Sequence, residues 1–339
     1  MENQTNIPTN TTPNTQKKIV MSGMRPTGKL HLGHWVGALK NWVVLQNQYP
    51  CYFSIVDWHA LTTDYMKTGD IKRYNKEVLL DWLSAGIDPS KASIFVQSSI
   101  KEIAELYLLL NMITPLGWLE RVPTFKEQQA QLQDRDINTI GFLGYPLLQT
   151  VDIIVVRGNL VPVGEDQVYH IELAREVVRR FNFIYGNYFD EPQELLTPIP
   201  KLPGLDGRKM SKSYDNSIYL SDSREVVEKK IRPMKTDERR QRRTDPGVPD
   251  DCPVFDFHKC FSSEGERETI TQGCTTAGIG CIDCKKILIA NVHNLMDPIR
   301  ERREKYNNSN LDDILETGRK QAGEVAQKTL EDVRELVKV

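Results

Sequence analysis

The chain has no uninterrupted run of about 18 apolar residues, which is the length that a helix needs to cross a bilayer. Its most apolar stretch, residues 106–119, is broken by Asn111 and Pro115. Residues 1–17 are rich in Asn, Thr and Pro and lack the apolar core of a secretory signal, so we expect a disordered leader. These absences predict a cytoplasmic protein with no membrane partner.

The chain also lacks an excess of either charge, because 44 basic and 46 acidic residues leave a net charge of −2. Bulk charge therefore does not favour a nucleic-acid partner, which would need a local basic patch. Residues 229–243 form such a segment, with eight basic and two acidic residues. A solvated helix face is the usual role of such a run, so charge alone leaves its function open.

Cysteine is scarce, with six residues, but five of them lie between residues 252 and 284, and four of these five form a recognisable pattern. The spacing is C-x21-C-x6-C-x2-C, from Cys252 through Cys274 and Cys281 to Cys284. Four thiolates that include a C-x2-C pair fit a tetrahedral zinc ion or a Cys-ligated iron–sulfur cluster, and the spacing does not distinguish the two. Cys260 competes with Cys252 for the role of first ligand.

Buried strands and amphipathic helices alternate along the first part of the chain. The predicted strands are residues 18–22, 51–57, 93–98 and 160–164. Amphipathic helices are predicted from Leu32 onward and over 71–85, where Gly86 ends the second one. This alternation predicts an α/β fold with a doubly wound parallel sheet, whose ligands bind beyond the carboxyl ends of the strands.

The pattern changes near residue 220 and is helical or irregular from there to the end. A chain of 339 residues exceeds what one hydrophobic core usually covers. We therefore expect three parts, namely a leader (1–17), a catalytic domain (18–220) and an α-helical domain (221–339).

The stretch HLGH opens the first amphipathic helix. His31 and His34 are predicted on one face of its first turn, with Gly33 between them. Free backbone N–H groups and the helix dipole at such a position suit a phosphate, and two imidazoles can donate hydrogen bonds to its oxygens. The small Gly33 would let a flat base lie against the backbone. Two surface histidines at a helix start would produce the same pattern.

A second segment, GRKMSKS at residues 207–213, places Lys209 and Lys212 in a flexible loop. Two mobile ammonium groups suit a leaving pyrophosphate, because the negative charge moves during the reaction. A solvated lysine turn is the alternative interpretation. The presence of HLGH on the same predicted sheet domain argues against that alternative.

Together, residues 31–34 and 209–213 resemble the two signature motifs of the class I aminoacyl-tRNA synthetases. The resemblance implies a Rossmann-like catalytic domain, use of ATP with Mg²⁺, and a homodimer. The implied catalytic residues are His31, His34, Lys209 and Lys212. The implied ATP-binding residues are Gly23, Arg25, Gly33, Gly164, Asp166, Lys209, Met210, Ser211, Lys212 and Ser213. Lys126 is a further candidate phosphate ligand.

The stretch GYPLLQTVD places Tyr145, Gln149 and Asp152 on one helix face among apolar neighbours, as in a pocket with a few oriented polar groups. This stretch and VPVGEDQ at residues 161–167 resemble the tryptophanyl and tyrosyl branch of the family. In that branch the Tyr and Gln hold the α-amino group of the amino acid, and the Asp meets the far end of its side chain. Because a carboxylate accepts equally from a phenol or an indole, the Asp does not select the substrate.

The first strand separates the two substrates. Tyrosyl enzymes carry a Tyr where this chain has Met21, and a soft thioether suits a broad indole ring. Residues 21–181 resemble the bacterial tryptophanyl-tRNA synthetases, which implies L-tryptophan and tRNA(Trp) as substrates. His59 is expected either as pocket lining or as a structural histidine. The implied tryptophan-binding residues are Met21, His59, Tyr145, Gln149, Asp152, Ile153 and Gln167.

The Cys-containing segment resembles the C-terminal insert of a synthetase subgroup that binds a [4Fe–4S] cluster. The implied ligands are Cys252, Cys274, Cys281 and Cys284, with Zn²⁺ as the alternative metal. Beside such a catalytic domain, residues 229–243 are predicted to contact the tRNA phosphate backbone. Two alternatives stay open, a tyrosine–tRNA ligase and a catalytically silent iron–sulfur RNA-binding protein. Small adenylyltransferases share the HLGH turn of residues 31–34 (the His turn) but are much shorter and lack the loop of residues 207–213 (the lysine loop).

Overall fold

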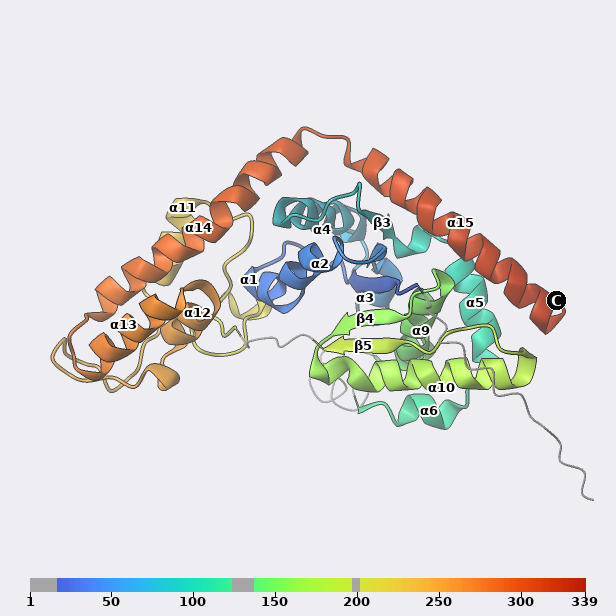
Figure 1. The fold of residues 1–339 in the computed structure, drawn as a ribbon, viewed down its shortest axis with the longest axis horizontal. Helices are drawn as coiled ribbons and strands as arrows, with labels where there is room; N and C mark the ends of the chain where they lie inside the picture. Colours follow the sequence, from blue (N-terminus) through green and yellow to red (C-terminus); the bar gives the residue numbers. More distant parts are fainter. Residues whose placement is uncertain (1–16, 124–136, 197–201) are drawn as a thin grey trace, which may run out of the picture.

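The computed structural model describes residues 17–123, 137–196 and 202–339. Its centre is a sheet of five parallel strands in the order β3-β2-β1-β4-β5 (Figure 1). The strands are β1 (Val20–Met24), β2 (Cys51–Ile55), β3 (Ala92–Val96), β4 (Leu160–Val163) and β5 (Gln193–Leu196). Strand order runs outward in both directions from β1, so the predicted doubly wound α/β fold is confirmed.

The sheet opens at its switch point between β1 and β4. β1 and β2 pair along their whole length, from Val20 opposite Cys51 to Met24 opposite Ile55. Within the described residues, β1 and β4 share a single pair, Val20 with Leu160. The carboxyl ends of these two strands are therefore unpaired with each other, which leaves the crevice in which doubly wound sheets bind ligands.

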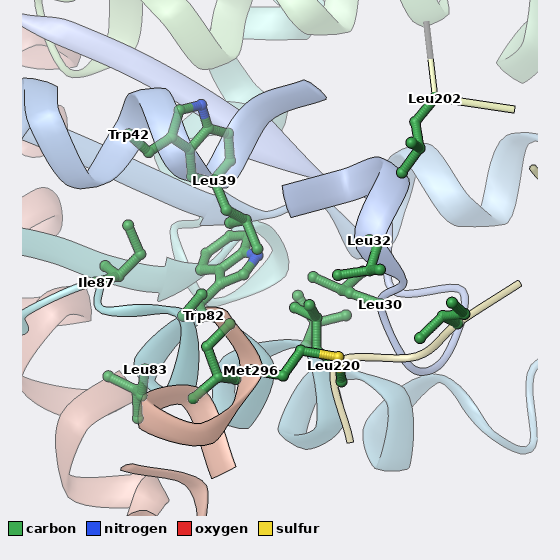
Figure 2. Close-up of a cluster of buried hydrophobic side chains, with 14 of the residues drawn as sticks. Leu30, Leu32, Leu39, Trp42, Trp82, Leu83, Ile87, Leu202, Leu220 and Met296 are labelled. Carbon is green, nitrogen blue, oxygen red and sulfur yellow. The ribbon is translucent and has the colours of Figure 1, made fainter. Parts of the chain in front are cut away.

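Helices cover both faces of the sheet, and a cluster of buried apolar side chains lies under each layer. The helices of this part are α1 (Leu32–His34), α2 (Lys40–Leu45), α3 (Asp57–Asp64), α4 (Ile71–Ala85), α5 (Glu102–Asn111), α6 (Leu116–Glu120), α8 (Ile140–Leu143), α9 (Tyr145–Val155) and α10 (Val168–Tyr185). Figure 2 shows one of the clusters, in which Trp42 and Trp82 meet edge to face with ring centroids 5.2 Å apart.

The C-terminal part is helical, as predicted. Its helices are α11 (Arg224–Ile231), α12 (Pro253–Phe261), α13 (Glu264–Thr275), α14 (Cys281–Asn307) and α15 (Leu311–Val337). The two longest, α14 and α15, form the arms of a wide V over the rest of the molecule (Figure 1). No helix in the described ranges is long and apolar enough to span a bilayer.

Both arms of the V pack against the sheet domain. α14 lies on α4, where Met296 enters the apolar cluster of Figure 2. α15 lies on β3, and Gly318 permits this contact because a Cβ there would be 1.9 Å from the Ile94 carbonyl oxygen. The division into domains at residue 220 stays a prediction, and these contacts show that the C-terminal helices share the core of the sheet domain.

The predicted helix over 71–85 is α4, and Gly86 ends it in the left-handed conformation with φ of 112°. The helix predicted from Leu32 differs, because a π-helical segment (Trp35–Leu39) separates α1 from α2. Such wide turns are frequent at functional sites. Here the segment brings Gly37 and Ala38 to the wall of the cavity described below.

Candidate active site

A cavity of about 380 Å³ lies at the switch point, between the carboxyl ends of β1 and β4. All seven residues predicted to bind the amino acid line it, namely Met21, His59, Tyr145, Gln149, Asp152, Ile153 and Gln167. Three of the predicted ATP-binding residues, Gly23, Arg25 and Gly164, line it as well. A Cβ on Gly23 would lie 2.8 Å from the Ser54 carbonyl oxygen, so that position requires glycine.

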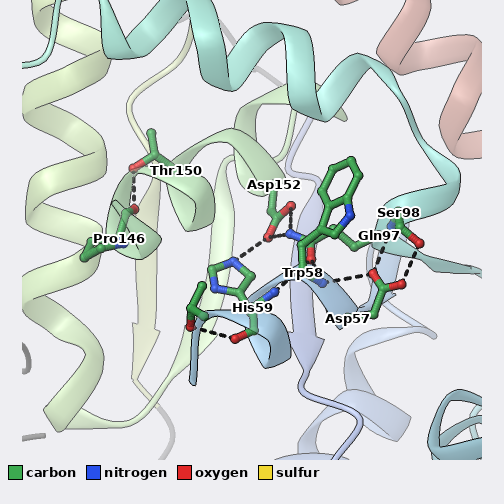
Figure 3. Close-up of polar contacts among 9 residues, drawn as sticks. Asp57, Trp58, His59, Gln97, Ser98, Pro146, Thr150 and Asp152 are labelled. Atoms are coloured by element: carbon green, nitrogen blue, oxygen red, sulfur yellow. Dashed lines mark hydrogen bonds and ion pairs between the residues drawn. The ribbon is translucent and has the colours of Figure 1, made fainter. Parts of the chain in front are cut away.

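The Asp152 carboxylate in this wall is held by two side chains (Figure 3). Gln97 Nε2 donates to its two oxygens at 2.8 and 2.9 Å, and His59 Nε2 lies 3.0 Å from Oδ2. Asp152 is 4% exposed, so its neighbours rather than water set its orientation. A carboxylate has about four acceptor positions, and those not used by Gln97 and His59 can accept from a ligand.

Gln97 was missed by the sequence analysis. It is fully buried, and its Oε1 accepts from the backbone N–H groups of Trp58 at 3.0 Å and His59 at 3.3 Å (Figure 3). One amide side chain therefore holds both the Asp152 carboxylate and the first turn of α3. The available signal was position, because Gln97 directly follows β3, at the edge where doubly wound sheets present ligand-binding groups.

A second hydrogen-bond chain runs from Tyr145 through His170, which the sequence analysis also missed. Tyr145 Oη lies 2.9 Å from His170 Nε2, and His170 Nδ1 lies 2.8 Å from Gln167 Oε1. Because an amide oxygen accepts only, Nδ1 carries the proton and Nε2 accepts from the Tyr145 hydroxyl. The Tyr145 oxygen is thereby set to act as an acceptor toward a donor such as an ammonium group.

The His pair caps the start of α1. His31 Nδ1 accepts from the Gly33 backbone N–H at 3.1 Å, and His34 Nδ1 accepts from the His31 backbone N–H at 3.2 Å. Each neutral ring therefore carries its proton on Nε2. His31 is thus the cap of the helix and not, as predicted, part of its first turn. Gly33 leaves room for the His31 ring, since a Cβ there would lie 2.9 Å from the ring.

Both imidazoles are neutral at neutral pH. Burial, with a smaller effect of the Lys212 charge, lowers the pKa of His31 to about 4. Burial, followed by His31 and Lys212, lowers the pKa of His34 well below its usual value. The two rings can therefore donate hydrogen bonds through Nε2–H without bringing positive charge to the site.

The lysine loop lies against the His turn. Met210 is buried, and its sulfur would be 3.6 Å from a Cβ on Gly33. Lys212 Nζ donates to the Thr27 carbonyl oxygen at 2.9 Å, and burial lowers the pKa of Lys212 to about 8. Lys209 is exposed. The structure therefore brings Lys212 to the His pair from 178 residues along the chain.

Asn216, which the sequence analysis also missed, holds the lysine loop by hydrogen bonds to its backbone. Its Oδ1 accepts from the Ser211 backbone N–H at 2.8 Å, and its Nδ2 donates to the Lys209 carbonyl oxygen at 3.1 Å. Asn216 is 3% exposed, so these bonds are shielded from water. Three predicted positions lie outside the described part of the structure, namely the side chains of Asp166 and Ser213 and the whole of Lys126.

The four predicted thiol ligands lie within electrostatic range of one another. Burial first, and then Cys252, Cys274 and Cys281, raise the pKa of Cys284 to about 12. Cys260 has other neighbours, since burial first and then Asp256 raise its pKa to about 11. All six cysteines are unpaired thiols. In the described ranges, no three Cys, His, Asp or Glu side chains converge closely enough to hold a single metal ion.

Comparison with known proteins places the chain in a family. Residues 13–297 match the family model described as tRNA synthetases class I (W and Y). The tryptophan–tRNA ligase of Thermotoga maritima is 52% identical over 319 residues, which cover 93% of this chain and 97% of that protein. That of Ralstonia nicotianae is 44% identical, with coverage of 94% and 98%.

The fold agrees with these sequence matches. The crystal structure of tryptophanyl-tRNA synthetase from Campylobacter jejuni, complexed with ADP and tryptophan, superposes with a TM-score of 0.84 at 30% identity, covering 95% of this chain and 100% of that chain. The chain therefore belongs to the class I aminoacyl-tRNA synthetases, and within them to the bacterial, ATP-dependent tryptophan–tRNA ligases.

Proposed function

We propose that the ligase activity is divided between two adjoining sites. Tryptophan binds in the cavity at the β1–β4 switch point, and ATP binds along the His turn beneath the lysine loop. The observation that carries this proposal is the buried Asp152 carboxylate, held by Gln97 and His59 in the cavity wall. The Campylobacter jejuni structure, which contains ADP and tryptophan, supports both ligands for this fold.

In the proposed cavity, Asp152 accepts from the indole N–H of tryptophan. A hydrogen bond to an ionised acceptor is stronger than one between neutral groups. The contacts of Gln97 and His59 with the Asp152 carboxylate fix its orientation. Met21, which is 3% exposed, supplies an apolar wall and no second polar partner for a phenol. The α-ammonium group meets Tyr145, Gln149 and Gln167, with the Tyr145 oxygen set as an acceptor by His170.

Adenylate formation then requires positioning and charge stabilisation. The tryptophan carboxylate attacks the α-phosphorus of ATP, a P–O bond forms, and the bond to the α,β-bridging oxygen breaks as pyrophosphate leaves. His31 and His34 donate through Nε2–H to phosphate oxygens, and Lys209 and Lys212 follow the charge as it moves to the leaving group. Mg²⁺ enters with ATP as part of the substrate.

In the second step, the terminal ribose hydroxyl of tRNA(Trp) attacks the carbonyl carbon of the adenylate, and AMP leaves. The exposed cations within 229–243, among them Arg232, Lys235, Arg242 and Arg243, suit contact with tRNA phosphates. Binding through these cations would weaken steeply as salt is raised.

The two steps are tested by ATP–pyrophosphate exchange and tRNA charging. We expect exchange that rises with tryptophan and does not respond to tyrosine. Exchange driven by tyrosine would support the tyrosine–tRNA ligase alternative. Retention of tRNA without any adenylate would support the catalytically silent RNA-binding alternative.

We further propose that Cys252, Cys274, Cys281 and Cys284 hold a [4Fe–4S] cluster. The support for this proposal is that all four are unpaired thiols and that, after burial, Cys252 and Cys281 raise the pKa values of both Cys274 and Cys284, whereas Asp256 raises that of Cys260. A bound cluster would supply a rigid cross-link between the start of α12, the end of α13 and the first turn of α14. Protein purified without oxygen should absorb broadly near about 400 nm and contain iron and sulfide. Colourless protein that contains zinc would establish the alternative metal.

A homodimer is proposed through the face formed by α3, α5 and α8. An apolar hollow of about 460 Å³ lies between these helices, lined by residues that include Trp58, Tyr107 and Gly141. Leu108 and Ile140 of these helices are 55% and 85% exposed. Exposed apolar side chains around a hollow are typical of protein interfaces. Light scattering should show that Ile140→Lys shifts the protein toward monomer, whereas Phe183→Lys, at an exposed position on α10, should not.

A further inference from the structure

The backbone of the His turn is held from two sides. The Leu30 N–H donates to Oδ2 of Asp81, on α4, at 2.7 Å. On the other side, the Leu30 carbonyl oxygen accepts from Leu220 N–H and the Leu32 N–H donates to the Ile218 carbonyl oxygen, both at 2.9 Å. His31 thus lies between Leu30 and Leu32, whose backbone groups are both hydrogen-bonded. Of the groups that hold them, only the Asp81 carboxylate is a side chain.

That side chain is a buried charge. Asp81 is 0% exposed, and a carboxylate in such a position is strongly destabilising unless a cation compensates it. The compensating cation is Arg303 of α14, which donates to Oδ1 of Asp81 and, at 2.9 Å, to Glu77. Burial raises the pKa of Asp81 to about 6, and Arg303 opposes that rise. Asp81 also acts on the lysine loop, because its charge raises the pKa of Lys212.

The same helix reaches the segment just beyond the second support of the turn. Arg300 lies one turn before Arg303, and its Nε donates to the Asp222 carbonyl oxygen at 2.9 Å, just beyond residues 218–220. α14 is also the helix that begins with Cys281 and Cys284. A helix of the C-terminal part therefore bonds to one support of the turn and to Asp222, two residues beyond the other, although the turn lies more than 250 residues earlier in the chain.

We infer that Arg303 is a positioning residue for adenylate formation, acting through the Asp81 carboxylate to hold the His31–His34 turn. The inference rests on the proposed roles of His31 and His34. Without Arg303, Asp81 would lose its compensating cation, and the acceptor for the Leu30 N–H would be weakened by protonation or moved toward water. The expected result is that the Nε2–H donors of His31 and His34 are displaced from the triphosphate of ATP.

The test compares two neighbouring arginines by ATP–pyrophosphate exchange. Arg303→Met should lower kcat by roughly 100-fold, the cost of a misplaced catalytic group, while KM for tryptophan stays within about twofold. The tryptophan cavity has no lining residue from α14 in the described structure, which is why its KM should hold. The matched control is Arg302→Met, because Arg302 ties α14 to α4 through the Ser84 carbonyl oxygen at 2.6 Å and does not touch Asp81. Its kcat should stay near that of the parent protein.

A charge-neutral double variant separates positioning from packing. Asp81→Asn combined with Arg303→Met leaves an uncharged acceptor for the Leu30 N–H and should recover most of the lost kcat. Equal losses in Arg302→Met and Arg303→Met, or no recovery in the double variant, would overturn the inference.

If Arg303→Met does not fold, Asp81→Ala and Asp81→Asn replace it. Loss of kcat with alanine and retention with asparagine support the inference, and equal rates overturn it.

The variant His34→Ala, measured in the same assay, distinguishes failure of the proposed function from failure of this inference. A normal rate in His34→Ala would remove the role of the His turn, whereas a slow His34→Ala beside a normal Arg303→Met would remove only the role of Arg303.

Discussion

The two halves of the proposed active site are held in different ways. In the proposed tryptophan cavity, the groups that would select the ligand are fixed from inside by buried side chains, with Gln97 and His59 on Asp152 and His170 on Tyr145. On the ATP side, the groups come from segments far apart in the chain. Lys212 bonds to the segment before the His turn, donating to the carbonyl and hydroxyl oxygens of Thr27, and Lys209 is exposed.

This difference matches the chemistry of each half. Selection of an indole depends on a polar group that keeps one orientation, because a carboxylate free to rotate would also satisfy other donors. Stabilisation of a leaving pyrophosphate depends on cations that follow a moving charge. Substitutions in the cavity should therefore change KM for tryptophan, and substitutions on the ATP side should change kcat.

The largest expected effect is that of His34→Ala. Loss of an Nε2–H donor at the triphosphate should lower kcat for exchange by about 100- to 1000-fold. The dissociation constant for tryptophan, measured by equilibrium titration, should change little because His34 does not line the cavity. His34→Gln, whose amide can both cap the helix and donate, should recover part of the rate. A normal exchange rate in His34→Ala would mean that the His pair has no role in catalysis.

Asp152→Ala should come next. Removal of a charged acceptor from the indole N–H should raise KM for tryptophan by about 10- to 100-fold, in line with about 1.5–3 kcal/mol for such a bond. Selectivity for tryptophan over other aromatic amino acids should fall with it, in exchange assays with each amino acid. Asp152→Asn keeps one acceptor oxygen and serves as the control. Unchanged selectivity in the alanine variant would show that another group reads the indole nitrogen.

Gln97→Met should raise KM for tryptophan less than Asp152→Ala does. The methionine fills a similar volume but cannot donate to Asp152, so KM for tryptophan should rise about fivefold, equivalent to roughly 1 kcal/mol. In the Asp152→Ala background the same substitution should have almost no further effect on KM. An additive effect would indicate that Gln97 acts through the fold of α3 rather than through the carboxylate.

The smallest expected effect is a pH dependence from Lys212. Burial lowers its pKa to about 8, so its ammonium charge is present below that pH and is lost as pH rises through it. Because kcat/KM reports the free enzyme, its value for ATP should be about fourfold lower at pH 8.5 than at pH 7. Lys212→Arg, which keeps its charge at both values, should remove this decline. A decline of the same size in both proteins would assign it to another group.

Much of the cavity could be predicted from the sequence, because its residues occur in short motifs whose spacing fits one helix face or one strand end. Tyr145, Gln149 and Asp152 are an example, and the structure places them together on α9. Their partners were not predictable in this way. Gln97 and His170, like Asn216 at the lysine loop, are single polar residues outside any motif, and their role depends on which residues lie beside them after folding.

The sequence alone determined the strand–helix alternation, the turn chemistry at positions such as Gly86, and the residue types at the two motifs, since these follow from local backbone preferences and side-chain periodicity. The tertiary structure decided which residues became partners. The clamp on Asp152, the contact of Lys212 with the residues before the His turn, and the pairing of Asp81 with Arg303 each join residues that are distant in the chain. Such contacts depend on how whole helices pack around the sheet, because burial leaves a polar group no partner other than its packed neighbours.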